Sequence, residues 1–238
     1  MAQYWWTPNP ADLGGAPSDW TSVVGNRGLE VKEDSSERLY LQIGGGSNTI
    51  TMQTLDSVGG VSLTNLQDTE IYAEYFFDSS IEGTANRDMR QIHRYSEPSG
   101  RTGYTFGNSV SSIEVNRFLN GGYGTLATQS GVVPTSGSQR IFTRSSSVGS
   151  AQKVRQWYNA ASEPLTWNLE VTNTDIVQTG RVGQYSYWSE YFRLYGMGIG
   201  TDGDAAPTGP LAPGPDTPIN PSITSLLATS ARLNWEQG

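Results

Sequence analysis

Apolar and polar residues alternate in short runs over residues 1–204, as they do in strands that have one buried face. The run 69–78 (TEIYAEYFFD) is the plainest, with Ile71, Ala73 and Tyr75 on one side of the expected strand. Comparable runs occupy 39–43, 48–55, 88–95, 101–107, 111–119, 139–145, 151–158, 165–172 and 190–200. Turns rich in Gly, Ser and Pro separate these runs. The pattern predicts an all-β fold, a two-sheet antiparallel β-sandwich.

Helical periodicity is weak throughout the chain. The best helical candidate, residues 57–66, is interrupted by Gly59 and Gly60, which disfavour a helix interior. No repeat of fixed period is present, so the sequence does not indicate a propeller or a solenoid. One sandwich over 1–204 remains the prediction.

The composition changes at residue 205. The segment 205–221 (AAPTGPLAPGPDTPINP) contains half of the chain's 12 prolines, which favours an extended linker. After it, residues 222–238 alternate again, with Leu233 and Trp235 on one side. This proline-led stretch with an inward Trp resembles the start of a fibronectin type III domain. We therefore expect a sandwich (1–204), a linker (205–221) and the start of a further domain or a tail (222–238).

Composition removes several classes of mechanism. The 238 residues include no Cys and one His, which excludes disulfides, Cys-ligated metals and a two-His centre within one chain. A net charge of −8 argues against nucleic-acid binding, and no apolar run is long enough to span a membrane. The N-terminus lacks the pattern of a secretory signal, so we expect synthesis in a cytoplasm.

The stretch 141–210 contains a series of motifs in a fixed order. They are Trp157 at the end of a strand, the turn Glu163-Pro164, Trp167, the segment 180–183 (GRVG) and the segment 200–203 (GTDG). This order resembles the concanavalin A-like lectin/glucanase jelly roll, in the laminin-G-like form found in many phage and bacterial extracellular proteins. The resemblance implies a jelly-roll sandwich and says little about activity.

Glucanases of this fold carry a strand motif with paired carboxylates, and the nearest text here is 70–74 (EIYAE). Tyr72 stands where the motif has Asp, and Glu70 and Glu74 would lie about 13 Å apart on a regular strand. A retaining pair needs carboxyl groups about 5 Å apart. A solvated strand face is the better interpretation.

The segment Gln91-Ile92-His93 resembles the Gln-Ile-His strand of jelly-roll alginate lyases. His and Gln act at the uronate there, and proton abstraction beside a carboxylate needs a base poised near neutral pH. The family's companion strand, Tyr-x-Lys-x-Gly-x-Tyr, has no counterpart here. Two other interpretations remain: a half-buried structural His on a sandwich face, or a glycan-binding face that Gln91, His93 and Tyr95 share by alternation.

The segment 201–204 (TDGD) provides two carboxylates, Asp202 and Asp204, in an oxygen-rich turn. Calcium prefers such ligands, and lectins of this fold often hold it, but a plain acidic turn is the better interpretation, because the alternating Asp/Asn pattern of a calcium loop is absent. No other cofactor is expected.

These observations predict a non-enzymatic bacteriophage virion protein, either a capsid decoration or a tail-fibre or tail-tip adhesion protein. It would dock on other virion proteins, as a homo-oligomer, through an aromatic segment that contains Tyr4, Trp5, Trp6 and Trp20. The sandwich would face outward and bind host surface polysaccharide, with no nucleic-acid or membrane partner. The alternatives are a polysaccharide lyase or depolymerase that uses His93, and a spacer between coat subunits without a ligand.

Overall fold

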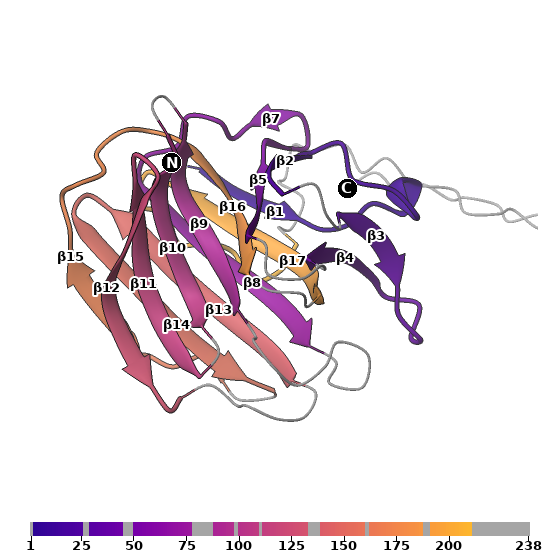
Figure 1. Ribbon diagram of the computed structural model, residues 1–238. Coiled ribbons are helices and arrows are strands. Elements are labelled where there is room, and N and C mark those ends of the chain that lie inside the picture. Colours follow the sequence, from indigo (N-terminus) through magenta and orange to yellow (C-terminus); the bar gives the residue numbers. More distant parts are fainter. Residues whose placement is uncertain are drawn as a thin grey trace, which may run out of the picture.

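The computed structural model describes residues 2–25, 29–44, 50–77, 88–97, 100–109, 111–132, 139–159, 162–187 and 191–210. Two antiparallel sheets pack face to face, with β9 to β12 in front of β13 and β14 in Figure 1. Sheet A has the order β15 (Leu169–Thr172), β14 (Ala151–Tyr158), β13 (Gln139–Val148), β8 (Thr69–Phe77), β17 (Tyr191–Thr201), β4 (Leu39–Gly44), β3 (Glu30–Glu33), and β1 (Ala2–Trp6) also pairs with β17. Sheet B has the order β12 (Gly122–Ser130), β11 (Ser112–Leu119), β10 (Thr102–Ser109), β9 (Asp88–Ser96), β16 (Arg181–Tyr187), β5 (Ile50–Leu55), β2 (Trp20–Val24).

The prediction of an all-β, two-sheet antiparallel sandwich is confirmed. The expected alternation holds in β8, where Ile71 and Ala73 are fully buried between the sheets and Glu74 lies on the outer face. The segment 57–66 forms a hairpin of β6 (Ser57–Val58) and β7 (Val61–Ser62), because Gly59 and Gly60 both adopt positive φ. The described residues contain one 3₁₀ turn, η1 (Pro10–Asp12), and no helix long and apolar enough to cross a membrane.

Two of the predicted docking aromatics belong to the hydrophobic core. Trp6 and Trp20 are 3% and 6% exposed, and their rings meet edge to face at 5.2 Å between centroids. They enter the same cluster from β1 of sheet A and β2 of sheet B. The expectation that both Trp residues dock on a particle is therefore wrong, since large aromatic side chains on inward strand positions close the core. Tyr4 and Trp5 are only half-buried.

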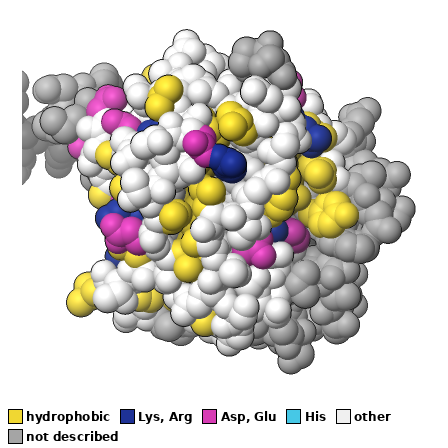
Figure 2. All heavy atoms as spheres, turned by 60° about the vertical axis from the view of Figure 1, so that its left-hand side comes forward, with side chains coloured by type: hydrophobic (Ala, Val, Ile, Leu, Met, Phe, Trp, Pro, Cys, Tyr) yellow, Lys and Arg dark blue, Asp and Glu magenta, His cyan; other side chains and the backbone are white. Residues whose placement is uncertain are grey.

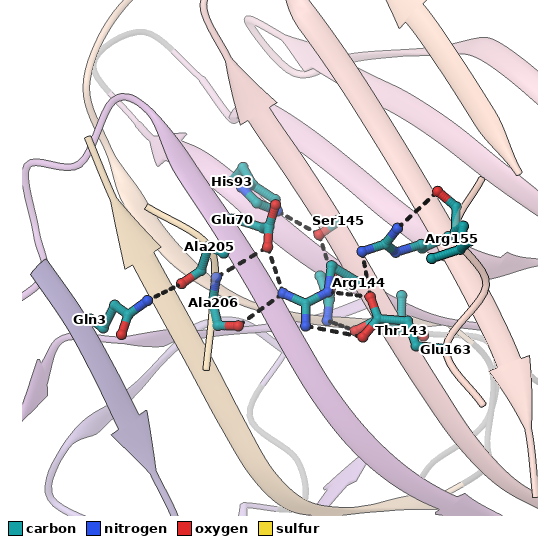
Figure 3. A network of polar contacts seen from close by, with 12 residues as sticks. Gln3, Glu70, His93, Thr143, Arg144, Ser145, Arg155, Glu163, Ala205 and Ala206 are labelled. Atoms are coloured by element: carbon teal, nitrogen blue, oxygen red, sulfur yellow. Dashed lines mark hydrogen bonds and ion pairs between the residues drawn. The ribbon is translucent and has the colours of Figure 1, made fainter. Parts of the chain in front are cut away.

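The segment 202–210, which we call the terminal segment, lies against the outer face of sheet A (Figure 3). Arg144 donates a hydrogen bond of 2.8 Å to the carbonyl of Ala206, and Glu70 accepts from the Ala206 amide at 3.1 Å. Gly198 and Gly200 on β17 leave room for this segment, because a Cβ there would collide with the carbonyls of Pro207 and Asp204. The first residues of the expected linker, 205–210, thus pack on the sandwich. Residues 211–238, with the rest of the linker and the expected further domain, lie outside the described residues.

Charged side chains are sparse on the molecular surface in Figure 2, and acidic and basic groups lie next to each other. This agrees with a charged content of 16%. Most of the polar surface is therefore uncharged.

Candidate functional site

Gln91 and His93 lie in the interior of the sandwich and are fully buried. His93 Nδ1 is 2.6 Å from the Thr69 hydroxyl of β8, and its Nε2 is 2.6 Å from the Ser145 hydroxyl of β13. Ser145 donates in turn to the Gln91 side-chain oxygen, and the Gln91 amide donates to the carbonyl of Thr143 at 3.1 Å. Because the Ser145 hydroxyl donates its only hydrogen to Gln91, it must accept a hydrogen bond from His93 Nε2. The neutral imidazole therefore carries its proton on Nε2, and Nδ1 accepts from the Thr69 hydroxyl.

Burial lowers the pKa of His93 to about 3, and the charge of Arg94 acts in the same direction. A fully buried, hydrogen-bonded imidazole can neither reach a uronate nor exchange its proton with one. The lyase interpretation of this strand is therefore not supported: His93 is a structural residue, and it is fully buried rather than half-buried as expected.

A β-bulge breaks the alternation that we expected in β9. Arg94 adopts a positive φ of 53°, and the β9–β10 register shifts between Thr102 and Tyr104. After the bulge, Arg94 turns into the sandwich (1% exposed), and Tyr95 joins a cluster on the outer face of sheet B. The prediction that Gln91, His93 and Tyr95 share one exposed face is wrong, because the bulge moves Tyr95 to the opposite face from the other two.

The outer face of sheet B carries a compact apolar cluster built only from strands of that sheet. Its buried members are Met52, Ile92, Tyr95, Phe118 and Tyr185. Above it lies a hollow of about 540 Å³, which we call the central groove. It is lined by Ile50, Asp88, Arg90, Arg101, Ser109, Glu114, Phe118, Gly121, Tyr123, Thr125, Tyr185 and Tyr187.

Tyr123 stands at the rim of the central groove with half of its surface exposed. It is placed there by a two-residue turn, since Asn120 and Gly121 both have positive φ and join β11 to β12. This turn pairs Tyr123 directly with Phe118, and their ring centroids are 5.2 Å apart. Tyr187, half-buried on β16, lines the same groove.

Arg90 fixes the polar floor of the groove and is itself buried (3%). It donates to both carboxylate oxygens of Asp88 at 2.7 and 2.8 Å, and Glu114 lies 3.3 Å away. Its NH1 group donates to the Tyr123 hydroxyl at 2.7 Å, which holds the ring in place. Its guanidinium also lies over the Tyr185 ring, 5.3 Å from the centroid.

The charges in the central groove balance. The lining contains two guanidinium groups and two carboxylates: Arg90 pairs with both Asp88 and Glu114, and the guanidinium of Arg101 lies 5.8 Å from the centroid of the Phe118 ring. Burial raises the pKa of Asp88 to about 6 although Arg90 holds it in a bidentate pair. The groove thus offers hydrogen-bond donors and acceptors beside aromatic rings, and its lining residues have no net formal charge.

The other candidates from the sequence lie elsewhere. Glu70 and Glu74 are on the outer face of sheet A, where Arg144 and Arg38 pair with them at 2.5 and 2.7 Å. Asp202 and Asp204 lie in the turn after β17, where their backbone amides donate to the carbonyls of Asp68 and Thr201. The described ranges contain no group of three or more His, Asp or Glu placed to hold a metal ion. These two aspartates therefore lack a third acidic ligand there, and the calcium site stays a prediction without support from the donor set.

Sequence reasoning missed the residues of the central groove. Tyr123 falls within NGGYG, a turn-like segment, and Asp88 and Arg90 belong to the expected strand 88–95, where the sequence does not distinguish them from other polar strand residues. The Asn-Gly pair at 120–121 was the available signal, because it indicates a two-residue hairpin whose second strand starts at Gly122.

Comparison with solved structures identifies the fold. The lumenal domain of VIP36 in its Ca²⁺/mannose-bound form matches with a TM-score of 0.54 at 9% identity, over 84% of this chain and 89% of that one. A Lotus tetragonolobus seed lectin matches with a TM-score of 0.52 at 7% identity (84% and 97% covered). The carbohydrate-binding module CBM66 from Bacillus subtilis matches with a TM-score of 0.50 at 11% identity (74% and 91% covered).

The chain has the concanavalin A-like lectin fold. The resemblance noted in the sequence is thereby confirmed at the level of the fold. No family model and no curated protein sequence matches the chain. Nothing in these comparisons bears on a phage origin or on a fibronectin type III segment.

Proposed function

We propose that this protein is a non-catalytic carbohydrate-binding domain whose ligand lies in the central groove of sheet B. The observation that carries the proposal is Tyr123, a half-exposed aromatic ring that is fixed at the rim by the buried Arg90. A preorganised ring of this kind can stack on the apolar face of a sugar without a further loss of side-chain entropy. The fold shared with lectins and with CBM66 supports the same conclusion by analogy.

Polar groups around the ring suit sugar hydroxyls. Glu114 offers an acceptor, whereas Ser109, Thr125 and Arg101 offer donors. The hollow of about 540 Å³ lies in the range typical of small-ligand sites. A few well-placed polar groups over an aromatic floor are what such a site needs for orientation and selectivity.

The test is a glycan array, followed by calorimetry on the strongest neutral ligand with the wild type and Tyr123→Ala. We expect the substitution to weaken binding at least about tenfold, which corresponds to roughly 1.4 kcal/mol. Leu165→Ala, at a residue that is 95% exposed in the loop before β15 on sheet A, is the matched control and should bind as the wild type does. Absence of any glycan ligand, or equal affinity in all three proteins, would overturn the proposal.

A non-enzymatic role agrees with the state of the candidate catalytic groups. His93 is buried inside the sandwich. Glu70 and Glu74 are held in ion pairs on the outer face of sheet A, which points away from sheet B and its groove. If the protein released unsaturated or reducing ends from alginate or bacterial exopolysaccharide, the role would have to be revised.

We propose further that the domain works on a virion, as a capsid decoration or a tail adhesion protein, and is assembled there as a homo-oligomer. Support comes from the low charge and the absence of Cys, and from Tyr4 and Trp5, which line a small hollow of about 340 Å³ with Gln3, Val58 and Pro210. Many copies on one particle, each with a low affinity for the glycan, would together bind a cell surface with useful avidity. Tyr4→Ser should reduce incorporation into particles, whereas unchanged incorporation would contradict docking through this hollow. Deleting residues 1–20 is not informative, since Trp6 and Trp20 are part of the core.

A further inference from the structure

A second hollow lies on sheet B at the end of β9. It measures about 430 Å³, and we call it the end pocket. It is lined by Thr64, Asn65, Tyr95, Ser96, Glu97, Gln178, Thr179, Gly180 and Arg181. All but the glycine carry a hydroxyl, an amide or a charged group, so the lining suits a hydroxylated ligand. None of these residues lines the central groove, although the ring of Tyr95 belongs to the apolar cluster beneath it.

Tyr95 connects the end pocket with the central groove. Its ring belongs to the same apolar cluster as Phe118 and Tyr185, which form the floor of the central groove. Its hydroxyl donates to Glu97 of the end pocket at 2.5 Å. The charges of Arg101, from the central groove, and Arg181, from the end pocket, both act on this hydroxyl. The two hollows therefore adjoin on one face of the sheet.

The end pocket is built rather than incidental, because two loops are locked together behind it. Leu66 and Gly180 exchange backbone hydrogen bonds of 2.8 and 2.9 Å, which ties the loop before β8 to the loop before β16. Arg94 lies behind both loops and donates to the carbonyls of Gln67 and Ile176 at 2.7 and 2.6 Å. A Cβ on Gly180 would collide with the backbone of Arg94 and Tyr95, so this close approach requires glycine.

The bulge in β9 produces both features at once. It turns Arg94 inward to clamp the loops and turns Tyr95 outward to join the two hollows. The two hollows together extend along β9 from Asp88, which lines the central groove, to Ser96, which lines the end pocket. At about 3.3 Å per residue this stretch of strand is roughly 26 Å long. That length exceeds a disaccharide.

We infer that the ligand is a linear, uncharged polysaccharide that lies along β9 and occupies the central groove and the end pocket together. Charge supports the uncharged class, because neither hollow has an excess of one sign: the end pocket is lined by one carboxylate (Glu97) and one guanidinium (Arg181, 3.6 Å from Asp56), and the central groove by two of each. The inference rests on the proposed function, since it assigns a second subsite to the same ligand.

Oligosaccharide ladders test the inference. Disaccharide to heptasaccharide series from laminarin, cellulose, starch and levan are titrated by calorimetry, with oligogalacturonates as the charged comparison. For the ladder that binds, we expect the affinity to rise at least about tenfold beyond the trisaccharide, which corresponds to roughly 1.4 kcal/mol. The oligogalacturonates should bind more weakly at every length.

Variants separate the subsites. Asn65→Ala and Gln178→Ala, in the end pocket, should abolish the increase in affinity for longer oligosaccharides and leave the affinity for the disaccharide unchanged. Tyr123→Ala should weaken binding at every length. Thr166→Ala, in the exposed loop before β15, is the control and should change neither quantity.

The two levels of the proposal fail in different ways. The extended binding site is wrong if a ladder binds with an affinity that does not depend on oligosaccharide length. It is also wrong if the end-pocket variants weaken the binding of every length equally or of none. In these cases the proposal that the central groove binds carbohydrate is unaffected. If no ladder binds, the inference falls, and the proposed function falls with it only if the glycan array also yields no ligand. Tighter binding of the oligogalacturonates would overturn the uncharged class alone.

Discussion

Arg94 holds three separate segments of the sandwich together, which makes its loss a strong test of the packing described above. Its guanidinium donates to the carbonyls of Gln67, Gly149 and Ile176 and to the Asp68 carboxylate, at distances between 2.6 and 3.1 Å. The side chain is 1% exposed. Replacement by Met keeps most of the apolar stem and the backbone strain of the bulge, and removes only these donors.

The expected cost follows from the acceptors left behind. The carbonyl of Ile176 is buried, and losing its donor costs about 2 kcal/mol, whereas the part-buried carbonyls of Gln67 and Gly149 cost about 1 kcal/mol each because water can reach them. Arg94→Met should therefore lower the free energy of unfolding by about 4 kcal/mol. That is a large part of the stability of an ordinary domain.

Urea unfolding followed by tryptophan fluorescence measures this difference. Arg117→Met is the matched control: its ion pair with Asp175 is about one-third exposed, so its removal should cost less than about 1 kcal/mol. A loss below about 1 kcal/mol for Arg94→Met would refute the clamp. A changed m-value would instead indicate that the substitution alters the unfolded state.

Three further predictions concern the interior and the terminal segment. The pKa of His93 is about 3 in the folded protein and about 6.5 in the unfolded chain, so the unfolded state binds the extra proton as the pH falls. The free energy of unfolding should therefore decrease by roughly 4 kcal/mol as the pH is lowered from about 6.5 to about 3, and His93→Gln should lose most of this pH dependence. Gly183→Ala should destabilise by about 3 kcal/mol or more, since its Cβ would strike the backbone of β5, whereas Gly209→Ala meets nothing and should be neutral within about 0.5 kcal/mol in the same denaturation assay. Glu70→Ala, which removes the acceptor, should loosen the terminal segment and speed hydrogen exchange at the Ala206 amide, and unchanged exchange would contradict that tether.

The sandwich could be predicted because burial repeats with a period of two along regular strands. In β8 every inward residue from Ile71 to Phe77 falls where alternation places it. The prediction failed in β9 because one residue, Arg94, takes a left-handed conformation that its residue type does not announce. A single such bulge exchanges the faces of all later residues in the strand.

The site depends on contacts that a sequence does not encode locally. Tyr123 gains its role from Arg90, 33 residues earlier, through the hydrogen bond across sheet B. Trp6 and Trp20 belong to the predicted docking segment, yet their rings pack against each other in the core. Long-range pairing of this kind distinguishes a core residue from a docking residue, and composition alone does not.

A carbohydrate that binds in the central groove of sheet B should change the NMR shifts of the residues that line it. These shifts are measured for the backbone and the tyrosine rings during titration with the best neutral oligosaccharide. We predict shifts for Tyr123 and Tyr187 and along the outer face of β9, β11, β12 and β16, with sheet A unaffected. Saturable binding with shifts confined to sheet A or to the terminal segment would contradict the account.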